Sequence, residues 1–195
     1  MFVRACRFES GPWHQMNISN FIEVKQNIIP KDLSNILISH YEEEDLWQES
    51  KFNYKDEVVD TEGVAMEECW IDSSMMFYHE TKHFLEKEVI EYSNKHQFMI
   101  EYGPPMRLNK YGKGGYMQLH YDAIRHSHGQ QYGYPHITIL SVLNDNFEGG
   151  EFFLIDKHYN LKNGDCIIFP SNFIFKHKVK EVTAGVRYSL MAWLM

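Results

Sequence analysis

Three residues that can bind a metal ion are spaced so that they could form one site. His120-Tyr121-Asp122 ends an alternating segment, and alternation along a strand places His120 and Asp122 on one face, with Tyr121 on the other. His177 alternates with lysines, and because lysines favour water the histidine is expected to point inward. Two imidazoles and one carboxylate on one side of a metal leave coordination positions open, which suits Fe(II) oxygenases. We therefore predict that His120, Asp122 and His177 bind an iron ion.

Simpler interpretations of these histidines stay open at this point. The chain has 11 histidines, so an H-x-D sequence can arise by chance, and an inward histidine is more often a hydrogen-bonded core residue than a ligand. His126 and His128 form an H-x-H pair that could bind a metal themselves, but no further ligand lies near them in the sequence. Solvated loop histidines are the simpler interpretation of that pair.

An arginine on the last apolar segment indicates a site for an anion. By alternation Arg187 and Ser189 share a face with Trp193, so the guanidinium is expected to be buried. An unpaired guanidinium inside a barrel is unfavourable, whereas a dicarboxylate held by Arg187 and by the Ser189 hydroxyl would compensate it. The distal carboxylate of 2-oxoglutarate fits this description. The alternative is a structural ion pair between Arg187 and an acidic residue of a neighbouring strand.

The first half of the chain is expected to be helical. One amphipathic helix should begin after Pro30 and end in the acidic run Glu42–Asp45, and a second should begin at a Ser73-Ser74 cap and continue through Tyr92. The apolar stripe of the second helix should pack on the later sheet. Lys51–Asp72 has no clear period and is interpreted as a loop region with one short strand at most.

The second half is expected to consist of short strands separated by turns. Glycine-rich turn signals such as Gly112-Lys113-Gly114-Gly115 divide a series of apolar or alternating runs, a pattern that favours an all-β sandwich or barrel. The predicted strands are Met106–Tyr111, Tyr116–Tyr121, His136–Leu143, Glu151–Ile155, Asp165–Phe169, Lys176–Val179 and Arg187–Leu194.

Composition limits the class of protein. With 195 residues, of which 44% are hydrophobic and 24% charged, the chain fits one globular domain over residues 1–195. The net charge of −8 argues against general nucleic-acid binding, which needs a basic surface. No apolar run is long enough to span a membrane, and the first residues lack a secretory signal, so a cytoplasmic location is the simplest expectation. Cys6, Cys69 and Cys166 are widely spaced and expected to stay reduced.

From about Asn109 to Trp193 the chain resembles the prolyl 4-hydroxylase-like branch of the Fe(II)/2-oxoglutarate dioxygenases. The similarity rests on the order and spacing of short motifs, which are specific only in combination: Tyr111 with its Gly-rich turn, His120-x-Asp122, Thr138, Leu143-Asn144-Asp145, Gly149-Gly150-Glu151, Lys162-Asn163-Gly164-Asp165, Phe169, His177, Val179, Val182, Gly185, Arg187 and Trp193. The resemblance implies a mainly β fold, a double-stranded β-helix (a cupin-like jelly roll). N-terminal helices over about residues 1–100 would buttress a catalytic β core over about residues 101–195.

The resemblance also implies roles for individual residues. It assigns the metal to His120, Asp122 and His177, and the co-substrate carboxylate to Arg187. It adds three helpers at the cofactor site: Tyr111, Thr138 and Ser189. Two departures from the family pattern affect the subfamily. Ser141-Val142 stands where many animal relatives have tyrosine, and arginine stands at position 187 where collagen-type enzymes have lysine, as in bacterial and phage-type members.

The implied activity is hydroxylation of a peptidyl residue such as proline. It would use Fe(II), 2-oxoglutarate and O2, with ascorbate as a further cofactor, and would release succinate and CO2. Segment Ala123–Pro135 has the composition of a loop and is a candidate substrate lid. Two alternatives stay open: an oxygenase of a small molecule such as a free amino acid, and a cupin-like metal-binding protein without oxygenase activity.

Overall fold

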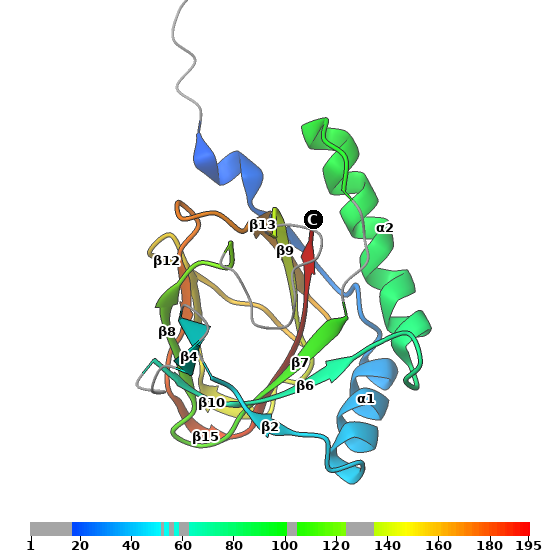
Figure 1. The fold of residues 1–195 in the computed structure, drawn as a ribbon, viewed down its shortest axis with the longest axis vertical. Helices are drawn as coiled ribbons and strands as arrows, with labels where there is room; N and C mark the ends of the chain where they lie inside the picture. The colour runs from blue at the N-terminus through cyan, green and yellow to red at the C-terminus, as the bar shows by residue number, and fades with distance from the viewer. Residues whose placement is uncertain (1–16, 52, 55–56, 59–62, 101–104, 124–134) are drawn as a thin grey trace, which may run out of the picture.

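The fold is a β core flanked on one side by two long helices (Figure 1). The computed structural model describes residues 17–51, 53–54, 57–58, 63–100, 105–123 and 135–195. Two antiparallel sheets enclose the barrel interior, and helices α1 and α2 lie along the outside of the larger sheet. The expectation of a mainly β jelly roll buttressed by helices is therefore confirmed.

The larger sheet has seven strands in the order β1-β13-β9-β16-β7-β6-β2, and every neighbouring pair is antiparallel. Its strands come from both halves of the chain, which means that the N-terminal half supplies strands as well as helices. They are β1 (Glu23–Lys25), β2 (Gln48–Glu49), β6 (Glu67–Ile71), β7 (Met106–Tyr111), β9 (Ile137–Val142), β13 (Cys166–Pro170) and β16 (Arg187–Leu194).

The smaller sheet has five strands in the order β12-β11-β14-β8-β5. They are β5 (Val64–Ala65), β8 (Tyr116–His120), β11 (Phe152–Leu154), β12 (Lys157–Tyr159) and β14 (His177–Val179). Two short antiparallel pairs complete the strands: β3 (Asn53–Tyr54) with β4 (Glu57–Val58), and β10 (Phe147–Gly149) with β15 (Val182–Gly185). All seven strands predicted in the second half are present, with ends shifted by one or two residues at most.

The large sheet is buried on both faces. Along β16, Leu190, Ala192 and Leu194 join a cluster against α1 and α2, called here the helix-side cluster. Met191 and Trp193, on the opposite face, join a cluster inside the barrel, called the barrel cluster. This alternation follows from the two-residue period of a strand. It gives each strand one face that supports the fold and one face that lines the interior.

The helices confirm one sequence-based boundary and correct another. Helix α1 (Lys31–Glu43) follows Pro30 as predicted, but α2 (Tyr78–His96) begins after the Ser73-Ser74 pair rather than at it. Asp72 accepts hydrogen bonds from the backbone N–H and the hydroxyl of Ser74, and this local turn competes with a helical start. A short 3-10 helix, η1 (Ile18–Phe21), precedes β1. The buried stripe of α2, including Leu85 and Val89, packs on the sheet as expected.

The segment Lys51–Asp72 contains more strand than the sequence-based interpretation as a loop region predicts. Strand β6 is a full member of the large sheet, with Cys69 opposite Leu108 of β7, and β5 belongs to the small sheet. The sequence of β6 is too polar to be recognised as a buried strand. Its charged residues are paired with residues far along the chain, such as Glu68 with Arg107. Cys69 and Cys166 are both buried and form no disulfide within the described part of the chain.

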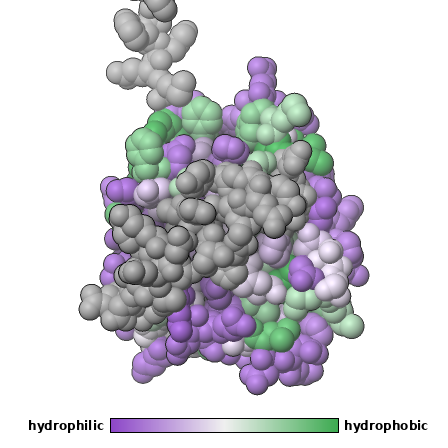
Figure 2. All heavy atoms as spheres, in the orientation of Figure 1, coloured by the Kyte–Doolittle hydropathy of each residue, from purple (hydrophilic) through white to green (hydrophobic). Residues whose placement is uncertain are grey.

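Apolar side chains are concentrated in the two interior clusters rather than on the surface. Figure 2 shows hydrophilic residues over most of the coloured area of one face, interrupted by smaller apolar areas. Within the described ranges, no helix combines the length and apolar character needed to cross a bilayer.

Candidate metal centre

The three predicted ligands lie where two strands of the small sheet meet. Strand β14 pairs with β8, and His177 is directly opposite His120. The register shifts between this pair and Val179↔Met117, so that two residues of β8, Gln118 and Leu119, face a single residue of β14. This is a β-bulge, which re-aims side chains along a strand. Simple alternation would separate Met117 from His120, but the bulge lets both face the barrel interior.

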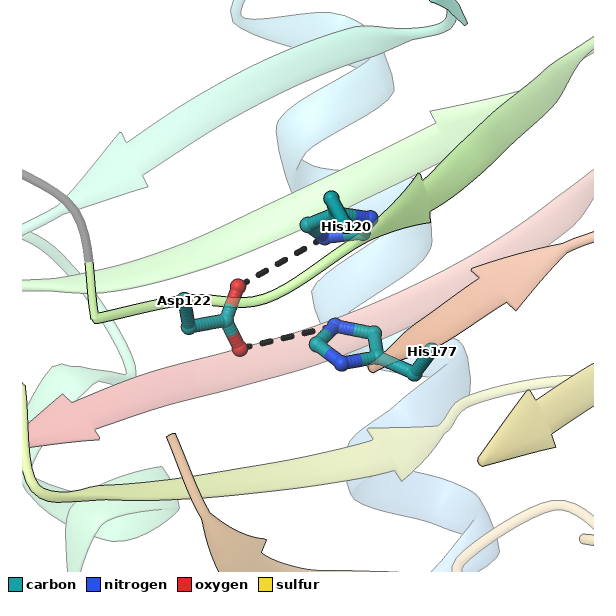
Figure 3. Close-up of side chains that lie close together, drawn as sticks. All are labelled: His120, Asp122 and His177. Atoms are coloured by element: carbon teal, nitrogen blue, oxygen red, sulfur yellow. Dashed lines mark ion pairs between the residues drawn. The ribbon is translucent and has the colours of Figure 1, made fainter. Parts of the chain in front are cut away.

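His120, Asp122 and His177 converge on one point. One candidate ligand atom from each residue lies within 4.8 Å of the other two. Figure 3 shows the Asp122 carboxylate between the two imidazoles, with Oδ1 3.5 Å from Nε2 of His120 and Oδ2 3.5 Å from Nε2 of His177. The ring centroids of the two histidines are 4.2 Å apart. The three side chains are therefore close enough to share one metal ion.

Backbone carbonyls select the histidine tautomers. Nδ1 of His120 lies 2.8 Å from the carbonyl oxygen of Gln118, and Nδ1 of His177 lies 3.2 Å from that of Phe175. A carbonyl can only accept, so in each ring Nδ1 carries the proton and donates. Both Nε2 lone pairs are then directed toward the Asp122 carboxylate. Histidine ligands of metals are typically oriented by such a bond from the other ring nitrogen.

Asp122 is held from behind by two hydroxyl residues. Its Oδ2 accepts a hydrogen bond of 2.7 Å from Thr138, and the Thr138 hydroxyl is 2.9 Å from that of Ser171. The backbone N–H groups of Asp122 and Ala123 both donate to the carbonyl oxygen of Ser171. Thr138, expected near the cofactor, contacts the candidate ligand Asp122 in this structure. Ser171 was not predicted, and a lone serine after a strand carries no sequence signal for this role.

The charges of the site suit a cation. Burial raises the pKa of Asp122, but His177, His120 and Thr138 outweigh burial and hold it well below its usual range. Burial lowers the pKa of His177 to about 4, against the opposing effect of Asp122. Asp122 is therefore ionised and His177 neutral at neutral pH, the protonation states that metal ligation needs. The donor set fits Fe(II), with two nitrogens, one carboxylate and room for open positions.

Arg187 is buried without a countercharge. It is 1% exposed, and it forms no ion pair with any acidic residue in the described ranges. Its Nη1 donates to the hydroxyl of Ser189 at 3.1 Å, and its guanidinium lies over the rings of Tyr111 and Phe147, with centroid distances of 5.4 and 5.9 Å. Burial lowers the pKa of Arg187, although guanidinium stays protonated in proteins. The alternative of a structural ion pair finds no partner among these residues.

Gly150 of the Gly149-Gly150 pair has a packing role beside Arg187. Gly150 has φ +63°, and a Cβ there would lie 2.9 Å from Cδ of Arg187. A side chain would therefore push Arg187 from its place as well as strain the backbone. The predicted helper Tyr111 is buried at the same place, and burial raises the pKa of its phenol.

The candidate lid at 123–135 lies largely outside the described residues, as do His126 and His128.

Comparison with known proteins agrees with this geometry. Residues 106–195 match the model of the 2OG-Fe(II) oxygenase superfamily. A PKHD-type hydroxylase of Thermosynechococcus vestitus is 31% identical over 96 residues, which cover 46% of this chain and 42% of the relative. One of Pseudomonas putida is 32% identical over 102 residues, with the same coverage of 46% and 42%. The matched region thus spans less than half the length of these relatives.

Solved structures are similar over most of the chain. A Pseudomonas putida prolyl-4-hydroxylase superposes with a TM-score of 0.69 at 15% identity and covers 89% of this chain and 91% of its own. A Trichoplax adhaerens prolyl hydroxylase in complex with a hypoxia inducible factor peptide fragment gives 0.70 at 17% identity, covering 91% and 84%. At this identity the similarity establishes the jelly-roll fold. The part of the chain that carries the candidate metal centre, residues 106–195, is thus similar to the 2OG-Fe(II) oxygenase superfamily, and the fold is the one seen in solved prolyl hydroxylases.

Proposed function

We propose that this protein is an Fe(II)- and 2-oxoglutarate-dependent hydroxylase that acts on a peptidyl residue such as proline, with release of succinate and CO2. The observation that carries the proposal is the convergence of His120, Asp122 and His177, with both Nδ1 atoms engaged by carbonyls. Bound Fe(II), with 2-oxoglutarate and O2, would supply the oxidising power that no side chain of this chain offers.

In this proposal Arg187 binds the distal carboxylate of 2-oxoglutarate. A buried guanidinium without a countercharge is costly, and a carboxylate that accepts from its forked donors would offset that cost. Ser189 already accepts from Arg187 and can donate its own hydrogen to the same carboxylate. The rings of Tyr111 and Phe147 cover the guanidinium and help to exclude water from the ion pair.

Thr138 and Ser171 would act on the metal through Asp122. The hydrogen bond from Thr138 to Oδ2 fixes the rotation of the carboxylate, and the Ser171 carbonyl fixes the backbone that carries it. Such support would keep the Asp122 carboxylate oriented toward the two Nε2 atoms, so that these three residues could hold the metal together. The peptide as substrate class is proposed from the similarity to PKHD-type and prolyl hydroxylases.

The test measures succinate formation by the metal-stripped protein after reconstitution with Fe(II) or Zn(II), with 2-oxoglutarate, and with or without ascorbate. We expect succinate only with Fe(II), faster turnover when proline-containing peptides are added, and a gain of one oxygen atom in a peptide by mass spectrometry. Stimulation by free amino acids but not by peptides would favour the small-molecule oxygenase. Tight retention of Zn(II) with no succinate under any condition would favour a cupin-like binding protein.

A further inference from the structure

A second buried arginine faces the barrel interior beside the metal centre. Arg107 lies on β7, opposite Met191 of β16, and is 8% exposed. It shares the barrel face of β7 with Asn109 and Tyr111 by alternation. The guanidinium of Arg107 lies over Trp193, and Trp193 is directly opposite Thr138 of β9, which donates to Asp122. Arg107 therefore lies on the interior face of the large sheet, next to the residues that hold Asp122.

The guanidinium of Arg107 is fixed in place and its charge is already balanced. It lies over the rings of Trp193 and Trp70, with Cζ 4.9 and 5.6 Å from their centroids. Its Nη1 donates to Oε2 of Glu68 at 3.2 Å. Glu68 is held in turn by the hydroxyl of Ser50 and the indole N–H of Trp70. The aromatic contacts and the ion pair leave the guanidinium little freedom to rotate.

Several donors of Arg107 nevertheless lack a good acceptor. Nε is buried and has no hydrogen-bond partner among the described residues, and Nη2 donates to the thioether sulfur of Met191, a weak acceptor. Oδ1 of Asn109, two residues along the same face, is also buried without a partner in the described part of the chain. Its Nδ2 donates to Ser189. Buried polar groups are usually satisfied, and here a donor and an acceptor without partners share one face of β7, where a ligand in the barrel could satisfy both.

We propose that Arg107 and Asn109 form a specificity site that recognises a neutral amide of the substrate. The guanidinium donates to the amide oxygen, and Oδ1 of Asn109 accepts from the amide N–H. A carboxylate is disfavoured because Glu68 already neutralises Arg107 and because Oδ1 of Asn109 would face a second acceptor. The proposal rests on the proposed function and narrows its substrate to a residue within a peptide, as opposed to a free amino acid.

The test compares two probes of nearly equal shape, N-acetylprolinamide and N-acetylproline, which differ in an amide against a carboxylate. Binding to the Zn(II)-loaded protein is followed by tryptophan fluorescence, because Trp70 and Trp193 contact Arg107. We expect half-saturation at an about 10-fold lower concentration for the amide, the usual gain from a hydrogen bond to a charged donor. Equal binding of both probes to the wild-type protein, or no response to the amide, would overturn the proposal.

Substitutions separate recognition from a structural role. Glu68→Gln uncovers the charge of Arg107 and should reverse the preference toward N-acetylproline. Arg107→Met removes the donors and should weaken amide binding about 10-fold, whereas Lys110→Met, on the other face of β7, should not. Arg107→Lys keeps the charge but lacks the Nε donor, and it serves if the methionine variant fails to fold. A lower melting temperature with an unchanged amide preference would show that Arg107 is only structural.

The two proposals can fail independently. Probe binding is measured with Zn(II), so it does not require turnover. Succinate formation by the wild-type protein with Fe(II) tests the oxygenase proposal alone. Succinate without amide preference would leave the oxygenase standing and remove the specificity site.

Discussion

The two faces of β7 and β16 differ in the kind of side chain that they bury. On the helix side, β16 and β7 present apolar residues such as Leu190 and Leu108, which are fully packed against α1 and α2. On the barrel side, the same two strands present Arg187, Arg107 and Asn109, which are as deeply buried but keep unmet polar atoms or charge. Both faces of these two strands are buried, but only the barrel face carries a buried charge, that of Arg187, without an ionic partner among the described residues.

This difference distinguishes residues that stabilise the fold from residues that are expected to bind the co-substrate or substrate. A buried apolar side chain stabilises the protein by about 1.5–3 kcal/mol, whereas a buried unpaired polar group costs stability until a partner arrives. Substitutions on the helix side should therefore change stability, and substitutions on the barrel side should change binding and turnover. The following predictions test this division, beginning with the largest expected effect.

The largest effect is expected for His177→Ala. Loss of one of three ligands should lower Fe(II)-dependent succinate formation by more than about 100-fold, since the loss of a ligand's supporting partner alone costs 10–100-fold. The melting temperature of the metal-free protein should also fall, because a buried ring that packs against Phe152 and Phe169 is removed, so turnover is compared at a temperature where the variant is folded. Full activity in this variant would show that the assignment of the triad is wrong.

On the helix side, Leu190→Ala should lower the free energy of unfolding by about 2–5 kcal/mol, because Leu190 is fully buried between the sheet and the helices. Denaturant unfolding measures this loss. At a temperature where the variant is folded, its KM for 2-oxoglutarate should equal that of the wild-type protein. A raised KM would mean that the two faces are coupled.

Arg187→Met should separate stability from binding. The variant should raise the KM for 2-oxoglutarate about 10- to 100-fold through loss of a charge-assisted carboxylate contact. Its free energy of unfolding should stay equal or rise by about 1 kcal/mol, because an uncompensated buried charge is removed. Unfolding and steady-state kinetics are measured on the same preparation. Marked destabilisation with unchanged KM would indicate that Arg187 supports the fold instead.

The smallest effect is expected for Thr138→Val. The substitution preserves the shape of the side chain and removes the hydrogen bond to Oδ2 of Asp122. Metal affinity should fall about 10-fold, at the lower end for residues that support a ligand. Thr138→Ser keeps the hydroxyl and should retain wild-type affinity. Competition with a chromophoric chelator measures both variants, and equal affinities in the two would contradict the positioning role.

The sequence predicts the parts of this molecule that depend on local pattern. The period of two in Arg187–Leu194 correctly predicts a strand and its two faces, and residue type with spacing identified the three side chains that converge. Metal binding by them stays a prediction. Partners distant in sequence could not be predicted. Strand β6 is rich in charged residues, and their partners on β7 cannot be inferred from the local pattern. The contacts of Ser171 and Arg107 likewise depend on residues of other strands.

The bulge in β8 brings Met117 and His120 to one face although two residues lie between them, a spacing that regular alternation would send to opposite faces. Deleting either Gln118 or Leu119 would restore regular alternation, and Met117 and His120 would still share the interior face. Both of these side chains are exposed, so the core would lose no packing contact from them. The strand could therefore be one residue shorter and still present the same histidine, a tolerance that point substitutions alone would not reveal.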